Sequence, residues 1–355
     1  MRLRGPKMNV GLIGCGRVAE LHMCAYKHIP EANVVAVSDV NIEKAKAFAQ
    51  KYRVNKTFKD YLELLEIKNL DLVSICTPTS AHAEIACEAA KLGKNILLEK
   101  PMARSTAECD RIIHEASKHG VKLSISHNQL FLPTVMQAKA IVDSGEFDPS
   151  YFRVSVRESA ELIRAPNWTI APEQGGILWE TGCHSAYLQL HFLKNINEIS
   201  AIGEKIKHPV YDQFIALLRA PNQAIGVIEV SWLAKKLEII FELTSSDGKQ
   251  MKILDYNFFM KYPEKRPRRF LQGFYWDLKA IIKKWAKLEL NCIHYRHVLR
   301  GLPQYILINK YIDSIKTDLD PPVKPEDGRN SIALLEHIEQ SLNKNQPVKM
   351  NRSTH

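Results

Sequence analysis

Short apolar runs alternate with helical segments through the first third of the chain. The runs are Val10–Ile13, Val34–Ser38, Leu70–Cys76, Asn95–Leu98 and Lys122–Ser126. Between them, apolar residues recur at helical spacing, as in Ile42–Tyr52. Because these strands are largely apolar, helices must cover both of their faces, which is typical of a parallel sheet. Right-handed crossovers then predict a Rossmann-type domain, which we assign to residues 1–127.

The pattern changes after residue 127. Longer strand-like stretches follow, several of them separated by short turns: Phe152–Arg157, Glu198–Ile202, Phe214–Arg219, Ala224–Trp232, Leu237–Ser245 and Lys249–Leu254. Such stretches predict a largely antiparallel sheet. Helices are expected at Phe131–Ser144 and Gly328–Asn343, so we assign residues 128–355 to a second α/β domain.

Composition places the chain among globular proteins. Its 355 residues are enough for two domains, and 45% are apolar and 25% charged. No apolar run approaches the about 20 residues that span a bilayer, and the first residues lack the apolar core of a signal peptide. The seven cysteines include no Cys-x-x-Cys pair and no His/Cys cluster with zinc spacing. We therefore expect a cytoplasmic protein without a metal site.

A glycine-rich turn follows the first strand and leads into a helix, with the sequence Gly14-Cys15-Gly16-Arg17-Val18-Ala19. This fits the dinucleotide fingerprint G-x-G-x-x-G/A. Gly14 permits the tight turn, Gly16 lets the backbone approach a pyrophosphate, and Ala19 lets the helix pack closely on the strand. The residues of this turn, Arg17 and Val18 included, are candidate cofactor contacts.

Asp39 stands at the end of the second strand, 23 residues after Gly16. A carboxylate there accepts hydrogen bonds from the adenosine ribose and repels the 2′-phosphate of NADP. Alternatively, Asp39 caps the following helix. With the glycine turn, Asp39 predicts a dinucleotide site that takes NAD in preference to NADP.

Two further motifs stand at later strand ends, where open α/β sheets bind ligands. They are Cys76-Thr77-Pro78-Thr79-Ser80-Ala81-His82 and Glu99-Lys100-Pro101. In its order of glycine loop, T-P-x-x-x-H and E-K-P, the chain resembles the glucose–fructose oxidoreductase / inositol 2-dehydrogenase / rhizopine catabolism protein (Gfo/Idh/MocA) family. The resemblance covers nearly the whole chain, from Asn9 to the final helix.

The resemblance implies a Rossmann domain followed by an open-faced α/β domain, with NAD(P) between them. It implies hydride transfer between nicotinamide and a hydroxyl or keto carbon of a sugar, polyol or nucleotide-sugar. The cofactor contacts that it implies at the strand ends are Thr77, Pro78, His82, Glu99, Lys100, Pro101 and Asn128.

Three residues are the candidate catalytic groups. Lys100, beside a proline at a strand end, can hydrogen-bond the reacting oxygen and stabilise alkoxide character. Glu180 and His184 are four apart and share one face of the first turn if Thr181–Leu193 is helical, which suits proton transfer. The family usually shows G-G-x-x-x-D-x-G-x-H here, so Glu180 replaces an aspartate and can contact His184, the substrate or Lys100. All three are also candidate substrate contacts.

Weaker candidates flank these groups. Trp168 resembles a family tryptophan before the double glycine, and it either covers the substrate or belongs to the core. Tyr187 and His191 follow His184 at helical spacing, and we interpret His191 as packing.

Two other functions stay open. Some family members retain NAD and cleave a glycosidic bond by transient oxidation and elimination. The second is that of a cofactor-binding regulatory protein with weak catalysis. The glutamate at position 180, where the family usually has aspartate, is the one sequence feature that points to it.

Charge is concentrated late in the chain. The net charge is +10, and residues 255–316 contain 13 Lys/Arg against 5 Asp/Glu. We expect a helix at Phe274–Leu290 with one basic face. That face either lies in water, contacts an anionic membrane surface or forms a cationic rim of the site for an anionic substrate. No nucleic-acid-binding motif accompanies this charge, so no nucleic-acid partner is expected.

An uncovered sheet face is expected to pair with a second copy. Ile225, Val227, Ile239 and Phe241 alternate along the predicted strands and are expected to supply one apolar face. We therefore expect a homodimer or homotetramer, as is common in the family.

Overall fold

The computed structural model describes residues 7–159, 161, 167–171, 176–256, 258–262 and 298–350. The expected basic helix Phe274–Leu290 lies outside these residues. No helix of the described residues is long and apolar enough to cross a membrane.

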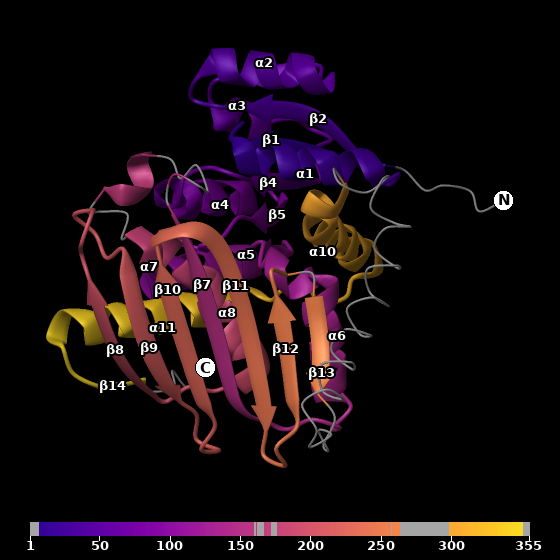
Figure 1. The fold of residues 1–355 in the computed structure, drawn as a ribbon. Helices are drawn as coiled ribbons and strands as arrows, with labels where there is room; N and C mark the ends of the chain where they lie inside the picture. The colour runs from indigo at the N-terminus through magenta and orange to yellow at the C-terminus, as the bar shows by residue number, and fades with distance from the viewer. Residues whose placement is uncertain are drawn as a thin grey trace.

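A six-stranded parallel sheet forms the first part of the fold, in the order β3-β2-β1-β4-β5-β6 (Figure 1). Its strands are β1 (Met8–Ile13), β2 (Ala32–Ser38), β3 (Lys56–Phe58), β4 (Leu72–Ile75), β5 (Asn95–Leu98) and β6 (Leu123–Ile125). The connecting helices are α1 (Arg17–His28), α2 (Ile42–Tyr52), α3 (Tyr61–Leu65), η1 (Thr79–Ala81), α4 (His82–Lys91) and α5 (Thr106–Lys118). All four residues of β4 are buried, as a strand covered on both faces requires. The predicted Rossmann-type arrangement is confirmed.

A second, eight-stranded sheet has the order β13-β12-β11-β7-β10-β9-β8-β14. Its strands are β7 (Pro149–Ser159), β8 (Glu198–Glu204), β9 (Gln213–Arg219), β10 (Ile225–Ser231), β11 (Leu233–Ser245), β12 (Gln250–Leu254), β13 (Phe258–Tyr262) and β14 (Val348–Lys349). β7 and β10 pair in parallel, and the other neighbours are antiparallel. The prediction of a largely antiparallel sheet is confirmed.

The helices of the second half are η2 (Asn128–Phe131), α6 (Pro133–Asp143), η3 (Asn167–Ile170), α7 (Gly176–Glu180), α8 (Gly182–Leu193) and α11 (Pro325–Lys344). In Figure 1, α8 and α11 run behind the second sheet, and α6 lies at its β13 edge. Gln189 of α8 ties helix to sheet, because its Nε2 donates to the carbonyls of Phe152 at 3.1 Å and Val227 at 2.9 Å.

Helix α10 (Val298–Thr317) returns to the first sheet and packs against α1. Its fully buried Tyr311 ends with Oη 2.8 Å from the carbonyl of Ile96 and 2.6 Å from that of Lys122. The same oxygen accepts the Ile96 N–H at 3.1 Å. A segment late in the chain thus packs beside β5 and β6 and bonds to the backbone of Ile96 and Lys122.

The strand residues expected to share one apolar face do not share it. Ile239 and Phe241 are buried, 2% and 1% exposed, whereas Ile225 is 47% exposed. The register explains this, because Ile239 and Phe241 pair with the buried Val156 and Val154 of β7. That part of the prediction is wrong: β11 presents its alternate residues to the open face.

Candidate active site at the strand ends

The predicted cofactor residues follow strands that end at one edge of the parallel sheet. These strands all run in the same direction and lie side by side in the order β2-β1-β4-β5-β6. Gly14, Asp39, Thr77, Glu99 and Asn128 come one to three residues after them. The topology therefore brings five distant parts of the sequence to the ligand-binding edge of an open sheet.

The glycine turn has the conformation that a dinucleotide fold requires. Gly14 has φ of +91°, and a Cβ there would lie 2.7 Å from the carbonyl oxygen of Cys76, so a side chain cannot be accommodated. A Cβ on Gly16 would meet nothing within 4 Å. Ala19 is fully buried, while Arg17 is exposed and Val18 half-buried at the start of α1. This open backbone at a helix N-terminus fits a pyrophosphate.

Asp39 stabilises the turn rather than capping a helix. Its Oδ2 accepts the N–H of Cys15 and its Oδ1 the N–H of Asn41, each at 2.9 Å. The cap of α2 is Asn41, whose side chain accepts the N–H groups of Glu43 and Lys44. The alternative role of Asp39 as the cap is therefore wrong. Each carboxylate oxygen keeps a lone pair that ribose hydroxyls can use.

The T-P-x-x-x-H and E-K-P motifs are joined by His82. Its ring is fully buried, with Nδ1 2.9 Å from the carbonyl of Pro101 and Nε2 3.0 Å from that of Thr77. Burial lowers the pKa of His82, and the two carbonyl acceptors oppose this shift. Thr77 Oγ1 is buried without a hydrogen-bond partner in the described part of the chain, as expected for a hydroxyl at a ligand site. Pro78 precedes η1, and the Lys100–Pro101 peptide is cis.

Glu99 is a buried carboxylate that contacts both His22 and the backbone of Lys100. His22 of α1 places Nε2 2.8 Å from Glu99 Oε1, and both residues are buried. Although burial opposes it, interactions with Cys76 and then Glu99 raise the pKa of His22 to about 10. Glu99 Oε2 accepts the backbone N–H of Lys100 at 3.2 Å. Glu99 thus orients the Lys100 backbone.

Lys100 forms an ion pair with Glu180. Its Nζ lies 3.2 Å from Glu180 Oε1 and 3.3 Å from the Glu180 carbonyl, and its side chain is 11% exposed. Burial acts most strongly and lowers the pKa of Lys100, but the charge of Glu180 together with smaller contributions from Cys183 and Glu99 outweighs it, and the pKa is raised. Of the contacts expected for Glu180, the structure shows the one with Lys100.

His184 is half-buried, and its Nδ1 lies 2.6 Å from the phenol oxygen of Tyr187. Burial, followed by the charge of Lys100, holds the pKa of His184 well below 6.5, so the ring is neutral at neutral pH. A neutral imidazole near an ammonium group can accept a proton from an alcohol that the ammonium polarises.

The helix expected at Thr181–Leu193 is observed as α8, and Glu180 belongs to the short helix that precedes it. Glu180 ends α7 and His184 lies in α8, with Thr181 between the two helices. Gly176 begins α7 with φ of +61°, and a Cβ there would lie 2.5 Å from Val210. Gly176 therefore packs tightly against the loop before β9.

Glu158 was missed from the sequence. It lies near the end of β7 and is 7% exposed. Its Oε1 accepts a hydrogen bond from Thr181 Oγ1 at 2.8 Å. Burial raises its pKa, and the neighbouring charge of Glu180 adds to this effect. An acidic residue one position beyond a predicted strand was the available signal.

The remaining candidates lie around these groups. Asn128 opens η2 with Oδ1 3.4 Å from the Tyr187 oxygen. Trp168 belongs to η3, but its side chain lies outside the described residues. His191 is half-buried and packs edge-on against Phe192. In the described part of the chain, no three His, Cys, Asp or Glu side chains group to hold a metal ion.

Comparison with known proteins adds two named relatives and one solved structure. Myo-inositol 2-dehydrogenase of Thermotoga maritima is 30% identical over 232 residues, 63% of this chain and 68% of that protein. The oxidoreductase YrbE of Bacillus subtilis is 29% identical over 229 residues, 62% and 66% of the two chains. The match thus spans about two thirds of each relative. The WlbA dehydrogenase of Bordetella pertussis, solved with NADH and UDP-GlcNAcA, superimposes with a TM-score of 0.83 at 21% identity over 99% of this chain and 100% of that one.

Family models agree with both parts of the fold. Residues 8–127 match the model described as oxidoreductase family, NAD-binding Rossmann fold, and residues 135–250 match the GFO/IDH/MocA C-terminal domain. Together these matches cover well over half of the chain, and the protein therefore belongs to the GFO/IDH/MocA family of oxidoreductases.

Proposed function

We propose that this protein is an NAD-dependent dehydrogenase that transfers a hydride between nicotinamide and a hydroxyl or keto carbon of a sugar, polyol or nucleotide-sugar. The observation that carries the proposal is the half-buried Lys100–Glu180 ion pair, together with a neutral His184, at the edge where the parallel strands end. Family membership and the dehydrogenases among the relatives support it.

Each side chain has a distinct part in the proposed reaction. When bound, NAD supplies the hydride acceptor. Lys100 donates a hydrogen bond to the reacting oxygen, and its charge lowers the cost of alkoxide character there. Glu180 contributes most to raising the pKa of Lys100 against the effect of burial, and it orients Nζ. His184 receives the hydroxyl proton, because its ring is neutral under working conditions.

Asp39 supports NAD over NADP. Its carboxylate lies beside the glycine turn and already accepts the N–H of Cys15. A 2′-phosphate at that position would place like charges together, which lowers affinity for NADP.

The test is to incubate the purified protein with NAD and a panel of polyols, free sugars and UDP-sugars, and to follow NADH absorbance. Lys100→Met is the inactive comparison, and Lys91→Met, on exposed α4 surface, is the matched control. Reduction of NAD by at least one compound, lost in Lys100→Met and kept in Lys91→Met, supports the proposal. Absence of NADH formation across the panel and in the reverse direction contradicts it.

Cleavage of a glycosidic bond with retained NAD is the second candidate, and Glu158 is the observation in its favour. A carboxyl with a raised pKa can protonate a leaving oxygen, which elimination requires and simple dehydrogenation does not. Release of the aglycone from an aryl glycoside without net NADH, lost in Glu158→Gln, would favour this function.

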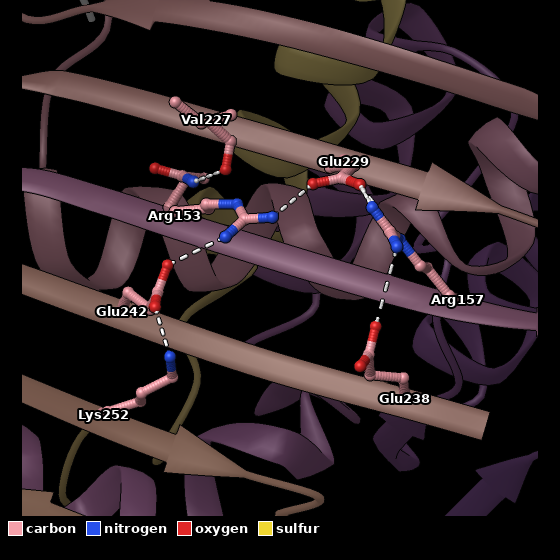
Figure 2. A network of polar contacts seen from close by, with 8 residues as sticks. Arg153, Arg157, Val227, Glu229, Glu238, Glu242 and Lys252 are labelled. Carbon is pink, nitrogen blue, oxygen red and sulfur yellow. Dashed lines mark hydrogen bonds and ion pairs between the residues drawn. The ribbon is translucent and has the colours of Figure 1, made fainter.

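We further propose that the open face of the second sheet pairs with a second copy of the chain. Four exposed apolar residues gather on β8, β9 and β10, namely Ile202, Ile215, Leu217 and Ile225, which are 44–65% exposed. Beside them, Figure 2 shows a charged band across β10, β7, β11 and β12. In it, Arg153 bridges Glu229 at 2.6 Å and Glu242 at 2.9 Å, and Lys252 pairs with Glu242. An apolar patch bordered by charge is typical of a protein interface.

A further inference from the structure

Tyr187 is a buried phenol in direct contact with His184. The residue is 2% exposed, and its Oη lies 2.6 Å from His184 Nδ1. The same oxygen accepts the backbone N–H of Gln129 at 3.3 Å and lies 3.4 Å from Asn128 Oδ1. The phenol therefore connects the proposed proton acceptor to the segment that follows the last strand of the parallel sheet.

The surroundings of Tyr187 keep its ring in place. His184 and Tyr187 are one turn apart on α8, so their relative position is set by the helix. His127 stacks on the phenol ring, with centroids 4.2 Å apart and an interplanar angle of 17°. Burial lowers the pKa of His127 to about 3, so this neighbour is neutral and leaves the phenol as the polar partner of Nδ1.

Counting protons distinguishes two arrangements. The Gln129 N–H always donates to the phenol oxygen, and the phenol has one proton of its own. If that proton points to His184 Nδ1, then Nε2 carries the ring proton and cannot act as a base. If the phenol instead donates to Asn128 Oδ1, its oxygen accepts a proton from Nδ1, and Nε2 is free to accept one.

We propose that Tyr187, with Asn128 as its acceptor, keeps a proton on Nδ1 of His184 and so makes Nε2 the atom that exchanges the substrate proton. The inference rests on the proposed dehydrogenase function and deepens it, with Tyr187 as a positioning residue. During oxidation the substrate O–H bond breaks and an Nε2–H bond forms, while the Nδ1–H bond persists. The hydrogen bond at one ring nitrogen thereby sets the state of the other.

The experiment is nitrogen NMR of the protein labelled with ¹⁵N-histidine, recorded without substrate. The signals of His184, one of 13 histidines, are identified by their loss in His184→Gln. The expected wild-type spectrum has Nδ1 protonated and Nε2 bare. A wild-type spectrum with the proton on Nε2 would overturn the proposal, and this outcome does not depend on whether the protein is a dehydrogenase.

Variants extend the test. Tyr187→Phe keeps the stacked ring and removes the oxygen, so the His184 proton should move toward Nε2. Asn128→Ala, measured by NMR without cofactor, should shift it in the same direction. With a substrate in hand, Tyr187→Phe should lower kcat about 10- to 100-fold with KM within about twofold.

Tyr311→Phe is the matched control, since it removes an equally buried phenol hydrogen bond away from the site. It should change neither the His184 signals nor kcat. Unchanged His184 signals in Tyr187→Phe, or an unchanged kcat, would refute the role of the phenol.

Discussion

At the scale of single residues, the proposed chemistry depends on a charged Lys100 and a neutral His184. We expect Lys100→Met and His184→Ala each to lower turnover about 10²- to 10⁴-fold, the usual range for acid–base groups. Glu180→Gln should cost less, because the amide oxygen can still accept a hydrogen bond from Lys100 Nζ and so keep the ammonium group in position. Steady-state rates with the substrate found in the panel check this.

Cofactor affinity separates these effects from damage to the fold. NADH binding, followed by fluorescence, should change little in the three variants, because their side chains lie at the reacting end of the proposed site. Turnover within twofold of normal in His184→Ala would remove the histidine from the proposed mechanism.

Asp39 makes a prediction about cofactor choice. Asp39→Ser removes the charge that opposes a 2′-phosphate, so the preference for NADH over NADPH should narrow about tenfold, equivalent to about 1.4 kcal/mol. Fluorescence titration with both cofactors measures it. Tighter binding of NADPH than of NADH by the unaltered protein would contradict the assignment.

The buried His127 predicts a loss of stability in acid. Its pKa is lowered from 6.5 to about 3 by burial, so below pH 6.5 the unfolded chain binds a proton that the folded protein does not. The free energy of unfolding should therefore fall as the pH drops from about 6.5. In urea unfolding between about pH 7 and pH 5, His127→Phe should lose less stability than the wild type, by up to about 2 kcal/mol.

A phenylalanine replacement of the exposed His28 serves as the control for that comparison. It should reproduce the wild-type loss between the two pH values. An equal loss in His127→Phe would show that His127 titrates normally in the folded protein.

The sequence identified several of the residues that meet at the site, but not all of their contacts. Lys100, Glu180 and His184 stood in recognisable motifs. Glu158 did not, because its position depends on how far β7 extends and on the Thr181 hydroxyl. The Tyr187 contact with His184 follows helical spacing, whereas its contact with Gln129 joins residues 58 apart in the sequence.

At the scale of elements, α10 yields a stability prediction. Tyr311→Phe removes hydrogen bonds to the backbone of β5 and to Lys122 in a fully buried place. The free energy of unfolding should fall by about 1–3 kcal/mol, with kcat unchanged. Urea unfolding measures it, with Tyr305→Phe on the same helix as the half-buried comparison. A loss as small as that of the comparison would show that the phenol contributes little.

Elements with long, regular patterns were predictable and short ones were not. The central strands were found from their apolar runs, whereas β3 has three residues and α3 five, too few for a periodic pattern. The positive φ of Gly176 at the start of α7 goes with its close approach to Val210, a contact that sequence spacing does not encode. Likewise, which face of β11 is buried depends on its register with β7.

At the scale of the whole molecule, the open sheet face predicts self-association. Light scattering at micromolar concentration should give a mass of two or four chains. Replacing both Ile215 and Leu217 with glutamate should reduce the mass to that of one chain, because charge would replace apolar contact area.

The control for that experiment is Leu319→Glu, which alters an exposed leucine outside the sheet. It should leave the mass unchanged. A single-chain mass for the unaltered protein would rule out association through this face.

The return of the late helices to the first sheet has a consequence for synthesis. Tyr311 bonds to the backbone beside β5 and β6, Ser124 of β6 donates to the carbonyl of Val323, and Glu336 accepts from both the N–H and the hydroxyl of Thr106. A growing chain on the ribosome therefore exposes the first 127 residues well before their last partners emerge. Part of the apolar surface of the parallel sheet therefore stays exposed until Tyr311, Val323 and Glu336 have been translated. During that interval, chaperone binding or rapid translation and folding must protect the nascent protein from aggregation.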